Sequence, residues 1–475
     1  MNLYELLSEA GLSADLPDCE VCGVTENIDN VVKGSVFVAV AGVHCDGNEY
    51  ISSALEKGAV CAVSENPSDN RQILTVSDAR LALSMLCDAF YGHPHKKLKM
   101  VGVTGTNGKT TVCEYISFIL SSRGKRCGVI GTLGAKSESR TTQTGYTTPS
   151  AEILYRELDG FVKDGCEYCI MEVSSQALSQ KRVEPIRFSL SVFTNIGTDH
   201  LDYHKTFEDY LSAKARLIQL SDRALINADD INFCSIAENF SGEKYTYSAK
   251  DRYADFSAKD VKFRAASADY IYFNNKDIVP VKLDSTGELA VYNSLCAFSA
   301  CEILGADCIS FGILAEALPA IKGRMQKISA GGIDAIIDFA HTPQALESVL
   351  CALRQKDSGK IIVVFGCGGD RDKGKRPVMG EIAARLSDAV ILTDDNPRGE
   401  SSSEIINDIL SGIRGKRKVI VEPDRRKAIE KAIKKAKIGD TVLVAGKGHE
   451  EYQIIGSEKQ YFSDELTVRQ LFGLV

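Results

Sequence analysis

The sequence predicts an α/β protein of three domains: an N-terminal α/β domain, a central parallel-sheet domain, and a C-terminal Rossmann-like, doubly wound domain. Its 475 residues are too many for one domain of typical size, ~150 residues. From Met100 onward, apolar strand-like runs alternate with amphipathic helical stretches, as in α/β sheets. After Met325, four further apolar runs precede polar or glycine-rich loops and, in most cases, a helix.

We expect the domains at residues 1–97, 98–324 and 325–475. The first contains short β-like runs and two helical stretches, and it ends where Gly92 to His95 break the pattern. In the central domain, residues 169–173 and 189–195 are continuous and apolar, as buried parallel strands are.

Composition and charge exclude several classes of protein. With 44% hydrophobic and 25% charged residues, the chain is neither disordered nor fibrous. No apolar run reaches the ~18 residues of a membrane span, and the N-terminus lacks the basic region and apolar core of a secretory signal. We therefore expect a cytoplasmic protein with no membrane partner. The net charge of -8 argues against general nucleic-acid binding, but it permits anionic small substrates, which need only local positive charge.

One basic tract, 414–418 and 425–437, is the exception to this acidic balance. Ala428, Ile429 and Ala432 recur through it at helical spacing, which predicts a solvated helix with one buried stripe and no nucleic-acid partner.

The 15 cysteines are scattered through apolar stretches, which is typical of small buried side chains. Two CxxC pairs occur, Cys19/Cys22 and Cys166/Cys169, but they lie far apart in the sequence. A zinc site is the alternative, and reduced core thiols are the simpler interpretation.

A phosphate-binding loop is the strongest local signal. An apolar strand leads into a loop and then a helix at Gly105, Thr106, Asn107, Gly108, Lys109, Thr110 and Thr111. The glycines allow backbone amides to turn towards an anion, and the helix N-terminus adds a favourable dipole. Lys109 supplies charge at the β- and γ-phosphates, and Thr110 a hydroxyl for Mg²⁺. The general phosphate-loop pattern has a glycine at the position of Val103, so this loop fits only a narrower variant of that pattern. A glycine turn between strand and helix, without phosphate binding, is the alternative.

Acidic and imidazole side chains follow two of the predicted strands. Glu172 ends one apolar strand, and Asp199 and His200 follow the next. Carboxylate, imidazole and phosphate are suitable partners for Mg²⁺ beside a phosphate loop. A loop histidine bonded to backbone is the alternative for His200.

Lys214 lies on the apolar stripe of a helix that Thr206 and Asp209 predict to begin in a capping pattern. A buried ammonium needs neutralising, pairing or modification. From the residues alone, a lysine that extends to a nearby surface is the simpler interpretation.

The loop TGTNGKTT resembles the phosphate loop of the Mur ligases, the ATP-dependent amide-forming enzymes of peptidoglycan precursor synthesis. Order and spacing resemble the type that adds the third peptide residue, from roughly residue 35 to the C-terminus. The further motifs are TTPS at 147–150, MEVSSQAL at 171–178, FTNIGTDHLDYH at 193–204, YNSLCA at 292–297, GRM at 323–325, DFAHTP at 338–343, GGDRDKGKRP at 368–377, DNPR at 395–398 and GKGHE at 446–450.

The resemblance implies a Mg-ATP site in the central domain. It implies that Asn293, Arg324 and His341 lie around ATP, and that Lys109, Lys214, Arg324 and His341 are catalytic. The implied metal ligands are Thr110, Glu172, His200 and Lys214, the last as a carbamate derived from CO₂. A carbamate turns the cation into an anion that can hold Mg²⁺, which gives chemical sense to a lysine on an apolar stripe. Thr342 and Pro343 also fit an N-cap and first helical residue.

The resemblance also implies an amino-acid site in the C-terminal domain. Its residues, in loops after predicted strand ends, are Arg371, Asp395, Asn396, Pro397, Arg398, Gly446 and Glu450. A zwitterionic ligand needs both charge signs: arginine for carboxylates and Glu450 for ammonium. The DNPR sequence resembles the signature of enzymes that add meso-diaminopimelate, which is lysine with an extra carboxylate for Arg398. A turn made by Asp-Asn-Pro accounts for the backbone but not for Arg398.

At the nucleotide-sugar end, the resemblance implies that four residues hold the UDP-muramoyl dipeptide: Thr147, Thr148, Ser174 and Arg182. The sequence differs from the family pattern at three places in this region. Asn27, Ile28 and Asp29 replace the family's Asp-Ser-Arg signature, Gln176 replaces a histidine, and Tyr146 replaces an asparagine.

The resemblance therefore implies a monomeric ligase that joins meso-2,6-diaminopimelate to the D-glutamate γ-carboxylate of UDP-N-acetylmuramoyl-L-alanyl-D-glutamate through an acyl phosphate. The same chemistry with L-lysine or another acceptor is an alternative, motivated by the departures. A catalytically silent paralogue that acts as a binding protein is a second alternative.

Overall fold

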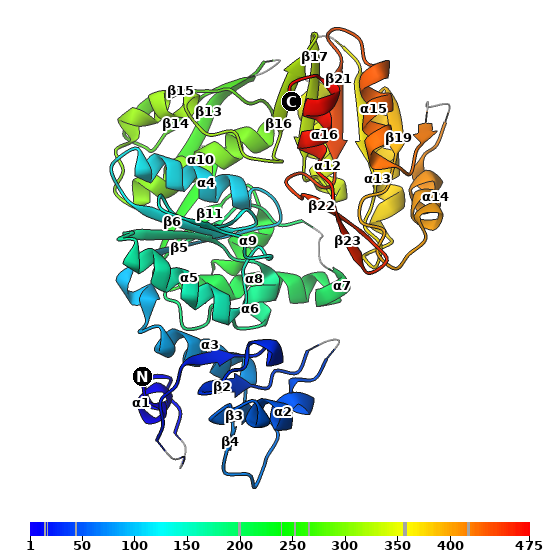
Figure 1. The fold of residues 1–475 in the computed structure, drawn as a ribbon. Coiled ribbons are helices and arrows are strands. Elements are labelled where there is room, and N and C mark those ends of the chain that lie inside the picture. Colours follow the sequence, from blue (N-terminus) through cyan, green and yellow to red (C-terminus); the bar gives the residue numbers. More distant parts are fainter. Residues whose placement is uncertain are drawn as a thin grey trace.

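The computed structural model describes residues 1–475 except 14, 15, 17, 43, 44, 198–200, 239, 251, 252, 265, 266, 355–358 and 416–418. Within this described part, three large sheets follow one another along the chain, helices pack on each of them, and a separate two-stranded sheet lies near the C-terminus (Figure 1). The α/β class predicted from the sequence is confirmed.

The N-terminal sheet has the strand order β1-β2-β3-β4, and all of its neighbours are parallel. Its elements are α1 (Leu3–Glu9), β1 (Gly23–Thr25), β2 (Ser35–Val38), α2 (Ile51–Glu56), β3 (Cys61–Ser64), β4 (Ile73–Thr75) and α3 (Ala79–Phe90). The β-like runs that the sequence predicts here, at residues 35–40, 59–63 and 72–76, correspond to β2, β3 and β4. The short strand β1 was not predicted, because three residues carry too little pattern to be recognised.

The central sheet has the order β15-β14-β13-β12-β11-β10-β5-β9-β6-β7-β8. Its strands are β5 (Lys99–Thr104), β6 (Cys127–Gly131), β7 (Gly134–Lys136), β8 (Thr141–Thr142), β9 (Tyr168–Glu172), β10 (Leu190–Phe193), β11 (Arg223–Asn227), β12 (Glu243–Ser248), β13 (Phe256–Phe263), β14 (Ala268–Phe273) and β15 (Ile278–Leu283). The two segments predicted as buried parallel strands are β9 and β10, which flank β5 in parallel. Antiparallel strands extend the sheet at both edges, an addition to the predicted parallel sheet.

Helices cover both faces of the central sheet. They are α4 (Lys109–Ser121), α5 (Ala151–Lys163), α6 (Ser175–Ser179), α7 (Leu201–His204), α8 (Phe207–Gln219), α9 (Ile231–Ile236), α10 (Glu288–Ile303) and α11 (Phe311–Glu316). The predicted cap of α8 is confirmed, since the Thr206 side chain accepts a hydrogen bond from Asp209 N. None of the helices in the described part combines the length and the apolar character that a membrane span requires.

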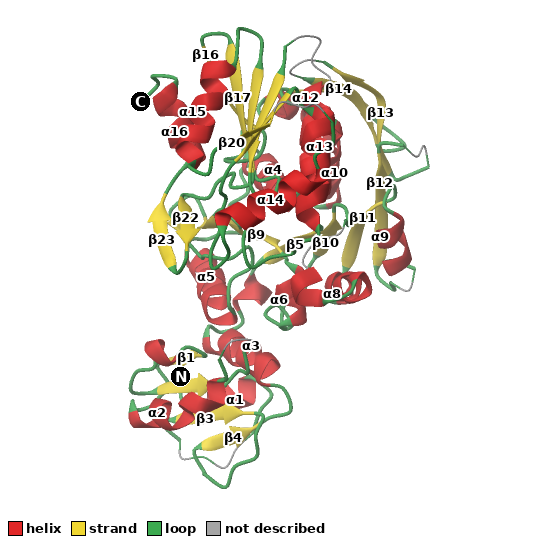
Figure 2. Ribbon diagram, turned by 90° about the vertical axis from the view of Figure 1, so that its right-hand side faces the viewer, coloured by secondary structure: helices red, strands yellow, loops and turns green. Residues whose placement is uncertain are grey.

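The C-terminal sheet has the order β16-β17-β21-β18-β19-β20 and is parallel except for the edge pair β16/β17. Its elements are β16 (Gln326–Ala330), β17 (Ile333–Asp338), α12 (Pro343–Arg354), β18 (Ile361–Phe365), α13 (Lys375–Leu386), β19 (Ala389–Leu392), α14 (Ser402–Gly412), β20 (Val419–Val421), α15 (Arg425–Lys435), β21 (Thr441–Ala445), the hairpin β22 (Tyr452–Ile455) and β23 (Glu458–Tyr461), and α16 (Asp464–Leu471). In Figure 2 this part lies at the top and the N-terminal part at the bottom.

Two sequence interpretations about helices in this sheet are confirmed. The basic tract contains α15, which buries Ala428, Ile429 and Ala432. Pro343 is the first residue of α12, and the Thr342 side chain accepts a hydrogen bond from Ala345 N.

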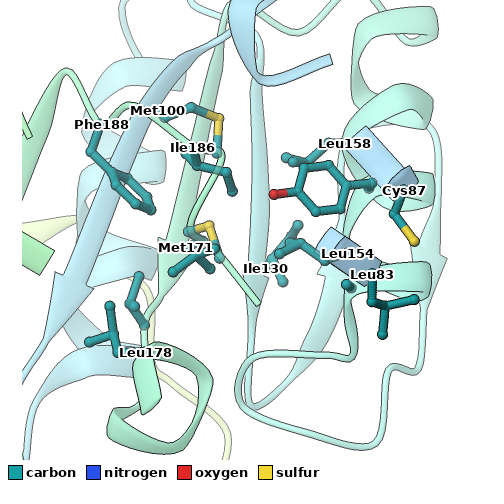
Figure 3. Packing of buried hydrophobic residues seen from close by; sticks show 14 of the residues in the cluster. Leu83, Cys87, Met100, Ile130, Leu154, Leu158, Met171, Leu178, Ile186 and Phe188 are labelled. Carbon is teal, nitrogen blue, oxygen red and sulfur yellow. The ribbon is translucent and has the colours of Figure 1, made fainter. Parts of the chain in front are cut away.

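One hydrophobic core continues from the N-terminal sheet into the central sheet. Figure 3 shows it from close by: Leu83 and Cys87 of α3 lie beside Leu154 and Leu158 of α5, next to Ile130 of β6. Because this core removes apolar surface of both parts from water, it holds them together.

Candidate functional site

The loop between β5 and α4 has the backbone path that a phosphate loop needs. Gly105 and Gly108 have φ angles of 148° and 89°, which other residues rarely adopt. A side chain at Gly105 would overlap Thr194 Oγ1, and one at Gly108 would overlap Asn293 Oδ1. Both glycines are therefore required by conformation and by space.

Side chains that follow β10 hold this loop in place. Thr194 Oγ1 donates to Asn107 O at 2.6 Å, and Asn195 accepts from Asn107 N at 3.1 Å. The Lys109 ammonium donates to the carbonyls of Gly105 and Thr106 at 2.8 and 3.0 Å. It therefore lies over the loop, where a bound phosphate would meet it.

Glu172, at the end of β9, is 1% exposed and surrounded by donors. Its Oε1 accepts from Thr110 Oγ1 at 3.0 Å and from Thr132 N at 2.7 Å. Its Oε2 accepts from Thr132 Oγ1 at 3.2 Å. Thr132, in the loop between β6 and β7, was missed by the sequence reasoning, because only the tertiary fold brings it to Glu172.

Lys214 of α8 is 2% exposed, so the simpler interpretation of a lysine that extends to the surface is wrong. Its Nζ donates to Gly105 O at 2.9 Å and to Thr104 Oγ1 at 3.4 Å, and it lies 4.8 Å from the ring centre of Tyr210. The side chain thus ends at the start of the phosphate loop.

Arg324 connects the C-terminal part to the phosphate loop. Its Nη2 donates to Thr110 Oγ1 at 3.3 Å, and its guanidinium lies 4.4 Å from the ring centre of Phe339. Burial lowers the pKa of Arg324, and the charges of Asp338 and Glu172 oppose that shift.

Two histidines flank the Phe339 ring. The His341 ring lies 4.6 Å from it, with Nδ1 at 2.8 Å from Phe339 O. The His449 ring lies 5.2 Å from it. Burial, together with the charges of Arg324, Lys322 and Lys447, lowers the pKa of His449 to about 3. His449 is therefore neutral near pH 7.

A cavity of about 400 Å³ lies at the carboxyl ends of the C-terminal strands, the usual ligand edge of such sheets. Its lining includes His341 and six of the seven predicted amino-acid-site residues: Arg371, Asp395, Asn396, Arg398, Gly446 and Glu450. Pro397, the seventh, lies between two of these in the chain.

The charges in this cavity are unevenly paired. Glu450 Oε2 accepts from Asn396 Nδ2 at 3.0 Å and from the fully buried Lys447 at 3.2 Å. Arg398, with a φ of 51°, donates to Gly369 O at 2.8 Å. In the part of the chain that is described, neither Arg371 nor Arg398 has a carboxylate within ion-pair distance. The cavity thus presents two guanidinium groups that can accept an anionic ligand.

The predicted nucleotide-sugar residues lie close to Glu172. Thr148 Oγ1 donates to Glu172 O at 2.8 Å and accepts from Ser174 N at 3.0 Å, and Arg182 donates to Thr148 O at 2.6 Å. Thr147 Oγ1 is 3.1 Å from Thr132 Oγ1. These four residues therefore form one cluster.

The residues that depart from the family pattern lie at this same end. Tyr146 lies under the Arg182 guanidinium, 5.7 Å from it, and Asn27 caps a short turn through Asp29 N. Asp199 and His200 lie outside the described residues.

Comparisons with known proteins cover both halves of this site. The family model described as the Mur ligase middle domain matches residues 103–301, and the model described as Mur ligase, glutamate ligase domain, matches 323–448. A relative from Parabacteroides distasonis is 39% identical over 100% of this chain and 99% of its own, and one from Aquifex aeolicus is 41% identical over 95% and 94%. Both are named UDP-N-acetylmuramoyl-L-alanyl-D-glutamate--2,6-diaminopimelate ligase.

Solved structures have the same architecture. A structure of a UDP-N-acetylmuramoyl-L-alanyl-D-glutamate--2,6-diaminopimelate ligase is 33% identical, with a TM-score of 0.69 over 95% of both chains. MurF ligase from Thermotoga maritima in complex with ADP has a TM-score of 0.62 at 21% identity, over 89% of this chain and 93% of its own, and so shares the fold.

Proposed function

Because this chain belongs to the Mur ligase family, we propose that it joins meso-2,6-diaminopimelate to UDP-N-acetylmuramoyl-L-alanyl-D-glutamate with hydrolysis of ATP. The reaction forms an amide at the D-glutamate γ-carboxylate, a step of peptidoglycan precursor synthesis. Residues 1–97 hold the nucleotide end, 98–324 hold ATP, and 325–475 hold the amino acid. The observation that carries the proposal is the cavity in which Arg371 and Arg398 have no carboxylate within ion-pair distance among the described residues.

The charges of that cavity suit diaminopimelate. Arg398 and Arg371 can each bind a carboxylate through paired N–H groups. Asp395 and Glu450 supply negative charge for an ammonium group, and Lys447 with Asn396 fixes the Glu450 carboxylate in one orientation. L-Lysine has one carboxylate fewer, so one guanidinium would be desolvated without a partner, which costs binding energy.

Phosphoryl transfer uses the phosphate loop and its neighbours. The γ-carboxylate attacks the γ-phosphorus of ATP, ADP leaves, and an acyl phosphate forms. Lys109 and Arg324 both reach the loop, where they can neutralise charge on the transferring group. The amine of diaminopimelate then attacks the acyl carbon, the amide forms, and inorganic phosphate leaves.

The residues around Thr110 fit a magnesium ion. A threonine hydroxyl and a buried carboxylate are hard oxygen ligands of the kind Mg²⁺ prefers. We assign Thr110, Glu172, His200 and the carbamate of Lys214 to this ion. It would supply charge neutralisation at the phosphates.

Carbamylation of Lys214 is supported by its burial. The neutral amine would add CO₂ and release one proton, leaving an anionic carbamate. Burying an ammonium group at 2% exposure costs free energy. The carbamate would place negative charge beside the phosphate loop, where a metal ion can share it.

The nucleotide-sugar end is assigned to Thr147, Thr148, Ser174 and Arg182. Arg182 can supply positive charge to an acidic group of the ligand. Burial lowers the pKa of Arg182, and the charge of Glu26 in the N-terminal part opposes this shift. Asn293 and His341 are assigned to ATP, the first because it lies beside Gly108.

The test is ADP release by the purified chain with Mg-ATP and the UDP-muramoyl dipeptide, in the presence of meso-diaminopimelate, L-lysine or no amino acid. Turnover with diaminopimelate alone is expected. Equal turnover with lysine would keep the ligase and reject the role of Arg398. If folded protein that binds ATP shows no turnover with diaminopimelate or with lysine, the acceptor is a different molecule. The departures from the family pattern at the nucleotide-sugar end would then account for that difference. A silent binding protein is disfavoured because Lys109, Glu172 and Lys214 are all in place.

A further inference from the structure

Three side chains that commonly bind metal ions meet where the N-terminal part joins the central part. Asp88 lies near the end of α3, and His93 and His95 follow in the short connection that includes the 3-10 turn η3 (Pro94–Lys97). Their ligand atoms all lie within 4.8 Å of one another. It is the one such His, Cys, Asp and Glu group found among the residues that the structure describes.

Two of these side chains are buried with polar atoms that lack hydrogen bonds. Asp88 is 4% exposed and His95 is 6% exposed. Asp88 Oδ1 and His95 Nε2 have no hydrogen-bond partner, although burying such atoms unpaired costs free energy. His95 Nε2 lies 3.3 Å from Asp88 Oδ2. Two ligands on a tetrahedral zinc ion at ~2.0–2.1 Å would be about 3.4 Å apart.

His93 is already oriented by a second carboxylate. Its Nδ1 lies 2.6 Å from Asp88 Oδ2, and its Nε2 lies 3.1 Å from Glu9 Oε2 of α1. Metal-binding histidines usually donate their other ring N–H to a carboxylate, which fixes the tautomer. With Nδ1 towards an ion, Nε2–H would donate to Glu9 in this way.

Tyr155 of α5 also has a buried hydroxyl without a hydrogen-bond partner. Burial and then the nearby charge of Asp88 raise the pKa of this hydroxyl. A water on the ion could satisfy that hydroxyl, because zinc with three protein ligands keeps a fourth position for water.

We propose that Asp88, His93 and His95 bind one zinc-class divalent ion, with Glu9 as the positioning carboxylate of His93. Two imidazoles and one carboxylate suit zinc, whereas magnesium prefers a ligand set in which most ligands are oxygen atoms. The ion would tie α1, α3 and the connection that leads into the central part together, at the edge of the core shared with α5. None of these residues is assigned to the ligase reaction.

The test measures zinc bound to the full-length chain after chelator treatment, by equilibrium dialysis in excess Mg²⁺. One tightly bound zinc per chain is expected. It should be lost in His95→Ala and retained in Cys22→Ser, which removes the exposed thiol of the Cys19/Cys22 pair. Glu9→Gln should weaken zinc binding by about 10- to 100-fold. The Glu9 side chain is 55% exposed, so this variant folds even if His95→Ala does not.

Cobalt substitution distinguishes the ligands. Co²⁺ in the wild-type chain should give the visible bands of a nitrogen and oxygen site without a sulfur charge-transfer band. Zinc should also raise the melting temperature of the wild type more than that of Glu9→Gln. Absence of stoichiometric zinc, a thiolate band, or wild-type affinity in Glu9→Gln would each overturn the proposal and leave the cluster as polar contacts between Asp88 and the two histidines.

Discussion

Arg324 donates a hydrogen bond to Thr110 with an Nη2–Oγ1 distance of 3.3 Å, so the segment that leads into the C-terminal sheet directly contacts the phosphate loop. Thr110 in turn donates to Glu172 at 3.0 Å. This chain of contacts joins the two halves of the site at the point where the phosphates of ATP are expected. We therefore expect the position of the C-terminal sheet to affect catalysis.

Replacing Arg324 with alanine should therefore lower kcat without unfolding the protein. Loss of one preorganised donor to a transferring group costs roughly 100- to 1000-fold in kcat. Steady-state ADP release measures this. Lys322→Ala is the matched control, since its side chain pairs with the half-exposed Glu451, and it should keep wild-type kcat. Similar kcat values in the two variants would contradict the role of Arg324.

Replacing Lys109 with alanine should abolish turnover while the fold is kept. The Lys109 ammonium donates to the carbonyls of Gly105 and Thr106. Removing this side chain should therefore change the charge of the loop but not its backbone conformation. ADP release and far-ultraviolet circular dichroism measure the two properties. Lys125→Ala, at an exposed pair with Glu167, is the control. Residual activity near that of the control would reject the phosphoryl-transfer role.

The phosphate loop could be predicted from the sequence because all its determinants are local. The strand, the two glycines, Lys109 and the following helix adjoin in the chain, and the structure keeps that order. The residues of the C-terminal cavity follow several strands, and the carboxyl ends of parallel strands share one edge. The sequence could therefore indicate that Arg371, Arg398 and Glu450 gather there.

Other parts depend on tertiary contacts that no local pattern records. Thr132 reaches Glu172 across forty residues of sequence, and Thr194 supports the loop from the neighbouring strand. Lys447 stands in a recognised motif, yet its burial against Glu450 follows only from the fold. The antiparallel strands β14 and β15 alternate in burial, but this alternation does not reveal that they extend a parallel sheet.

Lys214→Arg should be inactive although it keeps a positive charge. A guanidinium does not form a carbamate, so the variant separates the need for a cation from the need for an anion. In ¹³C-bicarbonate, the wild type should show a carbamate carbonyl resonance that Lys214→Arg lacks. Full activity in Lys214→Arg, or the same resonance in both proteins, would exclude the carbamate as the active form.

Arg398→Ala should raise KM for diaminopimelate far more than KM for ATP. A charge-assisted hydrogen bond to a carboxylate contributes about 1.5–3 kcal/mol, which corresponds to roughly 10- to 150-fold. The preference for diaminopimelate over lysine should fall by a similar factor. Arg385→Ala removes an exposed arginine paired with Glu347 and should leave both constants unchanged. An undiminished preference in Arg398→Ala would place recognition of the second carboxylate at Arg371 instead.

His449→Gln should make the stability of the protein less sensitive to acid. The pKa of His449 is lowered from an ordinary value of 6.5 to about 3, so the unfolded chain binds a proton at this position where the folded chain does not. The free energy of unfolding therefore falls as the pH drops from about 6.5 towards about 3. Glutamine takes up no proton, so the melting temperature of His449→Gln should fall less between about pH 7 and about pH 5. Cys351→Ser, at an exposed thiol whose pKa is raised from 9.0, does not titrate in this window and is the control. Parallel melting curves for all three proteins would mean that His449 takes up its proton equally in the folded and unfolded states.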